Sequence, residues 1–321
     1  MKVSVCTLTY NHVNYIKECI ESALAQKTNF DFEICIGDDG SNDGTSLICA
    51  DYARRYKNVK HILQDRKNII YINGRATGRY NFISLLGMMQ GQYIAMLDGD
   101  DYWTDSNKLQ SIVNFLDHNR DFSFAFHSCS ITENGTVRKD YLNQYTPDVI
   151  DLAYLARNGN CMRTMSVVFR NIYKQGVPEF FYHTPVGDYP FHIHNARHGK
   201  GKFIKKDMGV YRKHTAGIWS SYKSVEMKKE WLKMLEDISQ HDSDPHILRQ
   251  WREHMTEIAF SIGSILEKEN DAEADSYYAR AEAYAPDVCK KLREKPVQPA
   301  NKSILKRIKK IITGSFRGNY Q

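Results

Sequence analysis

Apolar and polar positions along the first 130 residues alternate between two patterns. Short continuous apolar runs predict buried strands, and apolar residues that recur at helical spacing predict amphipathic helices. The predicted strands are 3–10, 32–39, 59–64, 92–98 and 122–131. The predicted helices between them are 15–26, 45–56, 77–91 and 105–119, the last with an N-cap at Asp105 or Ser106. This alternation predicts an α/β fold with a Rossmann-like, mostly parallel sheet flanked by helices.

Beyond residue 131 the strand signals are sparser. Asn134 and Gly135 predict a hairpin turn. Further strands are expected at 165–170 and 202–214, and short helices at 149–159 and 187–201. From about residue 223 the pattern is helical and charged, which predicts a small helical C-terminal subdomain. We expect a main domain over 1–220 with halves at 1–101 and 102–220, then the helical subdomain over 221–296 and a tail over 297–321.

Two acidic clusters directly follow predicted strands. "GDDGSNDGT" (37–45) follows the second strand, and "DGDD" (98–101) follows the fourth. Ligands of such sheets lie beyond the carboxyl ends of the strands, so both clusters are expected to face one crevice. Asp98 and Asp100 hold two carboxylates close together with Gly99 between them, and hard oxygen ligands suit Mg²⁺ or Mn²⁺. The alternative is an acidic turn that caps the next helix.

The first acidic cluster also matches part of a calcium-binding loop. Asp39, Ser41 and Asp43 stand at the first three ligand positions of such a loop. However, Ala50 stands where the loop needs Glu, and a strand precedes the motif instead of a helix. We therefore exclude an EF-hand. A carboxylate in this turn can instead accept the N–H of a nucleobase.

Composition narrows the class of protein. The chain has 321 residues, 42% of them hydrophobic and 26% charged, as in ordinary globular proteins. It has no apolar run near the roughly 20 residues of a membrane-spanning helix, and its N-terminus turns polar too early for a secretory signal. The seven cysteines form no C-x-x-C pair and are expected to be reduced core thiols. These features predict a cytoplasmic protein.

The net charge of +6 resides in the tail, which carries six basic residues and no acid after Val297. The rest of the chain is balanced, so we expect no nucleic acid partner. Within the tail, one apolar helical stripe is flanked by basic residues; the stripe is Ile304, Leu305, Ile308, Ile311 and Ile312. Such a helix is expected to lie peripherally on an anionic membrane surface. The alternative is that the stripe docks on the helical subdomain.

The motifs occur in a characteristic order. "VSVCTLTYNHVNYIKECIESALAQ", "FEICIGDDGSNDGT" and "GQYIAMLDGDD" are followed by "GDYPFHIHNARHGKGKFIKKDMGVYRKHTAGIW". Over about residues 2 to 220 the chain resembles family 2 of the nucleotide-sugar glycosyltransferases, which adopt the GT-A fold. The motifs are specific as a set, although each one is loose.

The resemblance implies roles for residues of the donor half. Tyr10 would pack on the nucleobase, with the backbone of Thr7 and Leu8 beside it. Asp39 would bind the base, and Asp98 would lie near the ribose and the metal. The remaining residues implied on the donor side are Asp100 and His214 as ligands of Mn²⁺ or Mg²⁺, and Arg79 near the donor phosphates.

On the acceptor side, Asp188 falls where the family has its catalytic base, although Gly187 replaces the usual preceding Glu. Attack by a sugar hydroxyl needs a proton acceptor, which a carboxylate can supply. The alternative is that Asp188 caps the helix that follows it. Trp219 could stack on a sugar face or be a packing residue. Nearby histidines lack the Glu of a zinc-hydrolase helix and are expected on a helix surface; they are His192, His194 and His198.

The resemblance implies a metal-dependent, inverting hexosyltransferase. It would move a sugar from a nucleotide-diphosphate sugar to a hydroxyl of a glycan or lipid-linked acceptor, in surface polysaccharide synthesis. One alternative is a nucleotidyltransferase, which should carry a Gly-rich basic loop where "TYNHVNY" stands. The other alternative is a non-catalytic module that binds a cation or a sugar. The presence of Asp100, Asp188 and His214 argues against such a module.

Overall fold

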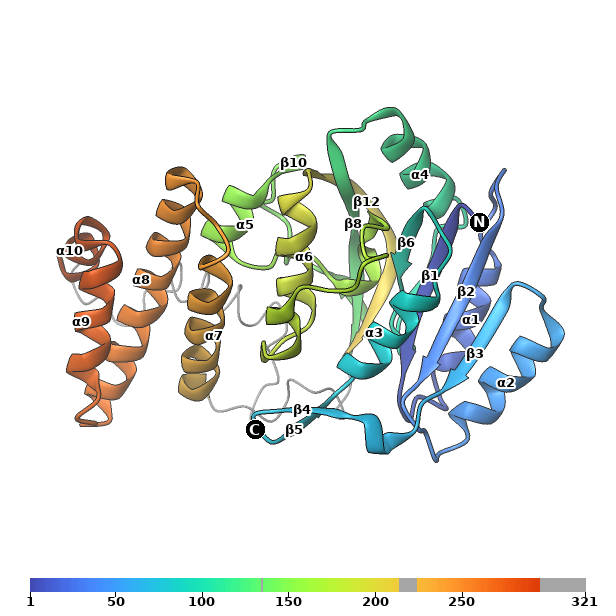
Figure 1. Ribbon diagram of the computed structural model, residues 1–321, viewed down its shortest axis with the longest axis horizontal. Helices are drawn as coiled ribbons and strands as arrows, with labels where there is room; N and C mark the ends of the chain where they lie inside the picture. Colours follow the sequence, from blue (N-terminus) through green and yellow to red (C-terminus); the bar gives the residue numbers. More distant parts are fainter. Residues whose placement is uncertain (134, 214–223, 295–321) are drawn as a thin grey trace. The chain divides into compact units, whose positions relative to one another are not determined.

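A computed structural model describes residues 1–133, 135–213 and 224–294 (Figure 1). The chain divides into two compact units. The described residues of the first unit lie within 1–150, 162–183 and 194–213. Those of the second unit are Asp151–Cys161, Thr184–Ile193 and 224–294. The predicted amphipathic tail falls outside the described residues.

One large sheet, ten-stranded within the described residues, organises the first unit. Its main path runs in the order β10-β12-β8-β11-β6-β1-β2-β3, while β7 pairs with β12 and β9 pairs with β8. The strands are β1 (Val3–Thr9), β2 (Phe32–Asp38), β3 (Val59–Leu63), β6 (Tyr93–Met96), β7 (Tyr102–Trp103), β8 (Phe122–Glu133), β9 (Thr136–Lys139), β10 (Val149–Ile150), β11 (Val168–Arg170) and β12 (Lys200–Lys213).

The sheet is parallel in one half and mixed in the other. The strands β6, β1, β2 and β3 are parallel neighbours, as the sequence predicts for the donor half. β11 lies antiparallel between β6 and β8, whereas β12 runs parallel to β8. The predicted α/β fold is therefore confirmed, and antiparallel pairing is concentrated beyond β6, where the sequence pattern is less regular.

Helices flank this sheet, as Figure 1 shows for the blue and teal part of the chain. They are α1 (Ile16–Leu24), α2 (Thr45–Arg55), α3 (Arg79–Met88) and α4 (Lys108–His118). A separate hairpin, β4 (Ile70–Ile72) and β5 (Arg75–Thr77), precedes α3. The predicted N-cap of α4 is wrong. The cap position is Asn107, and Asp105 Oδ1 instead accepts a hydrogen bond from Asn107 N (2.9 Å) in the preceding turn.

Both faces of the parallel half are covered, which explains its continuous apolar runs. Residues of alternating strand positions, such as Val5 and Ile36, share one buried cluster with α1, α2 and α4. On the other face α3 approaches closely, because a Cβ at Gly37 would lie only 2.0 Å from Asn81 Oδ1. All seven cysteines are buried, as predicted for core thiols.

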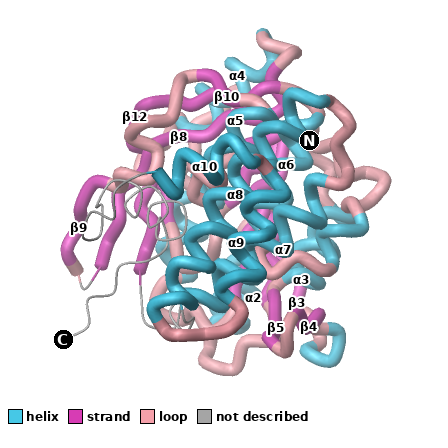
Figure 2. Tube along the Cα trace, turned by 90° about the vertical axis from the view of Figure 1, so that its left-hand side faces the viewer, coloured by secondary structure: helices cyan, strands magenta, loops and turns pink. Residues whose placement is uncertain are grey.

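The second unit is helical. Its long helices α7, α8 and α9 lie side by side in Figure 2. Asp244 caps α8 by accepting hydrogen bonds from two backbone amides, and Pro245 occupies its first turn. Within the described residues, no helix is long and apolar enough to cross a membrane. The helices of this unit are α5 (Leu152–Asn158), the first part of α6 (Asp188–Arg197), α7 (Ser224–Ser239), α8 (Pro245–Lys268), α9 (Ala274–Tyr284) and α10 (Pro286–Glu294).

Candidate active site

The acidic turn after β6 (residues 98–101) packs against the C-terminal end of β1. Gly99 N donates a hydrogen bond to the carbonyl oxygen of Leu8 (2.8 Å). A Cβ at Gly99 would lie 2.7 Å from the Cβ of Thr9, so a larger residue would push the turn away from the strand. The structure thus brings Asp98 and Asp100, which flank this glycine, to the place where β1 ends.

Negative charge accumulates in this turn. Asp101 is fully buried, and its Oδ1 accepts a hydrogen bond from Arg212 N (2.8 Å). Its Oδ2 is buried without a hydrogen-bond partner among the described residues. Burial raises the pKa of Asp101 well above its usual range, and the charges of Asp100 and Asp98 raise it further. The charges of Asp98 and Asp100 therefore act on a buried carboxyl group with an orphaned oxygen, and a cation beside the turn would offset them.

The donor set of the acidic turn fits a hard divalent cation, because carboxylate oxygens are the ligands that Mg²⁺ and Mn²⁺ prefer. Within the described ranges no three His, Cys, Asp or Glu side chains are grouped so that they could hold a metal. His214, the second ligand expected from the sequence, lies outside those ranges, as does Trp219.

Arg212, on β12, ties the acidic turn to the rest of the unit. Its Nη1 donates to the carbonyl oxygen of Asp100 (2.6 Å), and its Nη2 donates to the Glu18 carboxylate on α1. The guanidinium carbon lies 4.4 Å from the ring centroid of Tyr102. Sequence reasoning missed this residue. The available signal was a basic residue in "YRKH", at the polar end of a predicted strand.

Tyr10 and Asp39, which follow the neighbouring strands β1 and β2, lie close together, as the nucleobase hypothesis requires. Asp39 N donates to the carbonyl oxygen of Thr9 (2.9 Å). Arg66, which sequence reasoning also missed, links the two residues. It donates Nη1 to the Asp39 carbonyl oxygen (2.9 Å), and its guanidinium carbon lies 4.2 Å from the Tyr10 ring centroid. Burial raises the pKa of Asp39, partly offset by Arg66. Tyr10 remains 40% exposed.

The other acids of "GDDGSNDGT" hold the turn itself. Asp38 accepts hydrogen bonds from Ser41 N (2.9 Å) and from the Ser46 hydroxyl. Asp43 accepts hydrogen bonds from Thr45 N (2.9 Å) and Val13 N (3.0 Å). These carboxylates serve as caps of the turn.

The loops after β1 and β2 also bond to each other. Asn11, with a φ of 54°, donates its backbone N–H to Ser41 Oγ (2.8 Å). Its side-chain Oδ1 accepts a hydrogen bond from Asn42 N (3.0 Å). His12 N donates to Thr45 Oγ1 (2.8 Å). We name these two segments, residues 10–13 and 39–45, the paired donor loops.

Two further residues of the donor hypothesis lie inside the protein. Thr7 is 1% exposed, and its hydroxyl oxygen has no hydrogen-bond partner among the described residues. Arg79 is also buried, with its guanidinium carbon 4.3 Å from the Phe181 ring centroid and Nη1 donating to the Phe181 carbonyl oxygen. A phosphate contact by Arg79 stays a prediction.

Asp188 belongs to the second unit and begins α6. Its Oδ1 accepts a hydrogen bond from Tyr189 N and its Oδ2 from Asn160 Nδ2, each at 2.8 Å. His192, one turn further along α6, is only 1% exposed, so its expected place on the helix surface is wrong. Burial lowers the pKa of His192 to about 4, although the charge of Asp188 opposes this shift.

A half-parallel α/β sheet with a D-x-D turn at its carboxyl edge defines the class of fold, which is the GT-A fold. The sequence profile of glycosyl transferase family 2 matches residues 4–177, and the chain belongs to this family. The resemblance inferred from the motifs is thereby confirmed. An uncharacterized protein of Mycobacterium tuberculosis is 32% identical over 221 residues, which are 68% of this chain and 61% of the relative. The chain thus spans about three-fifths of the length of that relative.

Solved structures share the fold at low sequence identity. Staphylococcus aureus TarS 1–349 in complex with UDP-GlcNAc matches with a TM-score of 0.62 and 16% identity, over 98% of this chain and 89% of that chain. The mannosyltransferase PcManGT of Pyrobaculum calidifontis, in complex with GDP-Man and Mn²⁺, matches with a TM-score of 0.62 and 14% identity, over 98% and 86%. Both support the same architecture.

Proposed function

We propose that the protein is a metal-dependent, inverting hexosyltransferase. It transfers a sugar from a nucleoside-diphosphate sugar to a hydroxyl group of a glycan or a lipid-linked acceptor, in the synthesis of a surface polysaccharide. The observation that carries this proposal is the acidic turn, which brings Asp98 and Asp100, on either side of Gly99, to the end of β1.

The donor would lie along the carboxyl ends of β1, β2 and β6. The exposed ring of Tyr10 offers a stacking surface for the nucleobase, and the Asp39 carboxylate can accept one of its N–H groups. Asp100, with His214, would hold Mn²⁺ or Mg²⁺, and Asp98 would lie near the ribose and the metal. When bound there, the cation would neutralise the charge that develops on the departing nucleoside diphosphate.

Asp188 is the proposed general base. It would accept the proton of the acceptor hydroxyl as that oxygen attacks the anomeric carbon. A single displacement inverts the anomeric configuration, whereas retention needs a second, nucleophilic carboxylate. Arg79 and Trp219 keep their proposed roles at the donor phosphates and at a sugar face.

Two structural neighbours support the choice of donor, since they are complexes with UDP-GlcNAc and with GDP-Man and Mn²⁺. The charge pattern of residues 297–321 supports placement at an anionic membrane surface, on the cytoplasmic side. A lipid-linked acceptor would be within reach there.

The test is a donor screen on the full-length protein. UDP-glucose, UDP-GlcNAc and GDP-mannose are each added with Mn²⁺, Mg²⁺ or EDTA, and the thermal midpoint and the release of nucleoside diphosphate are measured. Cation-dependent stabilisation and release by one donor support the proposal. Stabilisation without release, even with oligosaccharide acceptors, would indicate a binding module instead. Pyrophosphate release from a nucleoside triphosphate and a sugar phosphate would indicate a nucleotidyltransferase.

A further inference from the structure

Both oxygens of the Asp188 carboxylate are held in place. Asn160 Nδ2 donates to Oδ2 and Tyr189 N donates to Oδ1, each at 2.8 Å. Two donors on different oxygens fix the rotation of the carboxylate about its Cβ–Cγ bond. The Asn160 amide donates without carrying a positive charge, so it orients the carboxylate without forming an ion pair that would oppose proton transfer.

Tyr189 is anchored in the helical unit. It is fully buried, and its hydroxyl donates to the carbonyl oxygen of Leu155 on α5 (2.9 Å). Its ring stacks on that of Trp231 of α7, with 5.0 Å between the centroids, and meets Trp251 of α8 edge-on at 6.4 Å. Because Tyr189 is covalently next to Asp188, these contacts fix the backbone that carries the carboxylate.

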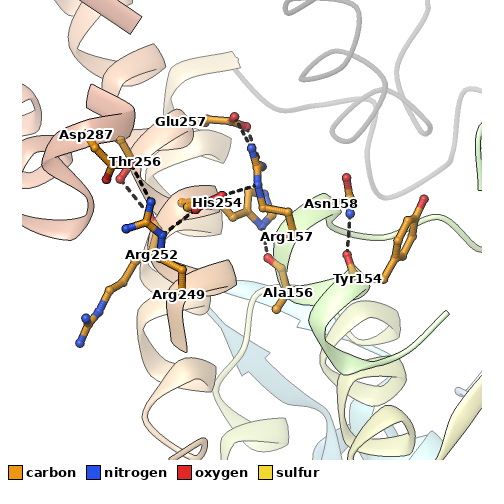
Figure 3. A network of polar contacts seen from close by, with 11 residues as sticks. Tyr154, Ala156, Arg157, Asn158, Arg249, Arg252, His254, Thr256, Glu257 and Asp287 are labelled. Atoms are coloured by element: carbon orange, nitrogen blue, oxygen red, sulfur yellow. Dashed lines mark hydrogen bonds and ion pairs between the residues drawn. The ribbon is translucent and has the colours of Figure 1, made fainter. Parts of the chain in front are cut away.

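Asn160 is anchored through α5. Gly159, with a φ of 76°, ends this helix and directs the chain to Asn160. Figure 3 shows what holds α5 in the second unit. Arg157 makes a bidentate contact with Glu257 of α8 (2.7 and 3.1 Å), and the ring Nδ1 of His254 lies 2.9 Å from the carbonyl oxygen of Ala156.

Charged hydrogen bonds of Arg157 and a hydrogen bond of His254 join α5 to α8. The Arg157 guanidinium also donates Nε to Glu253 (3.1 Å), so two carboxylates share it. Bidentate pairs of this kind add geometric specificity to the attraction. Burial lowers the pKa of His254 to about 4, so near neutral pH its ring is uncharged and its Nδ1–H can donate to Ala156.

We propose that Asn160 is a positioning residue for Asp188, and that α7 and α8 form the support that keeps Asn160 and Tyr189 in place. The inference rests on the proposed function, in which Asp188 is the general base. A base that is free to rotate spends part of its time pointing away from the acceptor hydroxyl, and small misplacements of a reacting group are costly. The C-terminal helices thereby contribute to catalysis without touching a substrate.

The test compares Asn160→Ala with the matched control Asn158→Ala. Asn158 lies two residues away, and its amide donates within α5, to Tyr154 O (2.9 Å). Release of nucleoside diphosphate is measured with whichever of UDP-glucose, UDP-GlcNAc and GDP-mannose the screen selects, together with donor affinity and the thermal midpoint. We expect Asn160→Ala to lower kcat by about 10- to 100-fold with donor affinity unchanged. Asn160→Ser, which keeps a short donor, should recover part of that loss, and Asn158→Ala should match the wild type.

A double-mutant cycle separates positioning from a merely structural role. If Asn160 acts through Asp188, adding Asn160→Ala to Asp188→Asn lowers kcat no further. The same fold-loss in both backgrounds overturns the inference, as does a kcat of Asn160→Ala within twofold of the wild type. Should Asp188→Asn alone turn over like the wild type, the assignment of the base in the proposed function is wrong. Should Asn160→Ala not fold, the cycle is run with Asn160→Ser.

Discussion

The backbone amide of Arg212 donates a hydrogen bond to the carboxylate of Asp101 across 2.8 Å, although the two residues are 111 positions apart in the chain. With the contacts of the Arg212 guanidinium to Asp100 and Glu18, it joins β12, the acidic turn and α1. The geometry of the proposed metal site therefore depends on a strand that carries none of the residues of the D-x-D turn.

Arg212→Gln should lower the free energy of unfolding by about 1–3 kcal/mol, because it leaves the partly buried carbonyl oxygen of Asp100 without its charged donor. It should also weaken cation-dependent donor binding. Urea unfolding and donor titration check this. Arg54→Gln is the matched control. Its side chain is 80% exposed beside Asp51, so it should change stability by no more than about 0.5 kcal/mol. Equal losses in the two variants would contradict the prediction.

Asp100→Ala should abolish both transfer and the stabilisation by donor and cation together, because a hard cation loses a direct ligand next to the diphosphate. Isothermal titration with the donor in Mn²⁺ and in EDTA measures this. Wild-type protein with undiminished activity in EDTA would exclude metal dependence altogether.

Asp188→Asn should leave donor affinity intact and lower kcat by about 10²–10⁴-fold, the usual contribution of a positioned base. The amide is nearly isosteric but cannot accept the proton. Steady-state kinetics at saturating donor decides the matter. A variant that loses donor affinity but keeps its kcat would make Asp188 a binding residue.

The buried Lys108 should make the free energy of unfolding depend on pH. It is fully buried, donates Nζ to the carbonyl oxygen of Met165 (2.8 Å) and lies 3.7 Å from the ring centroid of Trp103. Burial lowers its pKa well below the usual range. Between the folded and unfolded pKa values the unfolded chain binds more protons, so this lysine makes stability rise with pH.

Lys108→Met should remove that contribution. Below the unfolded lysine pKa of about 10.4, the slope of unfolding free energy against pH should be larger in the wild type by up to about 1.4 kcal/mol per pH unit. Urea unfolding at several pH values up to that point measures the difference between the two proteins. If the plots of unfolding free energy against pH are parallel for the wild type and the variant, Lys108 is charged in the folded protein.

Removal of residues 300–321 should abolish co-sedimentation with anionic vesicles, which high salt should also weaken. Donor hydrolysis or transfer to a soluble acceptor should persist, since no proposed site residue lies in this segment. Neutral vesicles serve as the control. If full-length and truncated proteins bind vesicles equally, or neither binds, the apolar stripe docks on the protein.

The regular elements of the first 130 residues could be predicted because each carries its own pattern, helical spacing in α1 and a continuous apolar run in β2. The hairpin β4–β5 and the strand β7 could not, since two or three residues are too few to show a period. The N-cap of α4 was misplaced because Asp105 caps the turn before the helix, and a local sequence pattern does not separate the two cases.

The site residues divide in the same way. Asp39, Asp98 and Asp100 carry a local signal, an acid at the end of a strand. Asn160 carries none, and Arg212 only that of a basic residue at the polar end of a predicted strand. Their proposed roles come from partners that only the fold brings near. His192 was expected on a helix surface because its segment lacks the Glu of a zinc-hydrolase helix, but tertiary packing buries it.

The paired donor loops have a consequence for binding. Asn11 bonds to Ser41 and Asn42 across the two loops, so each loop restrains the other where the proposed nucleobase would lie. A donor that binds there loses little additional loop entropy, since that cost is met during folding. Discrimination among nucleotides should then follow from the fit of the base to a rigid surface, and it should be expressed chiefly in the rate of donor dissociation.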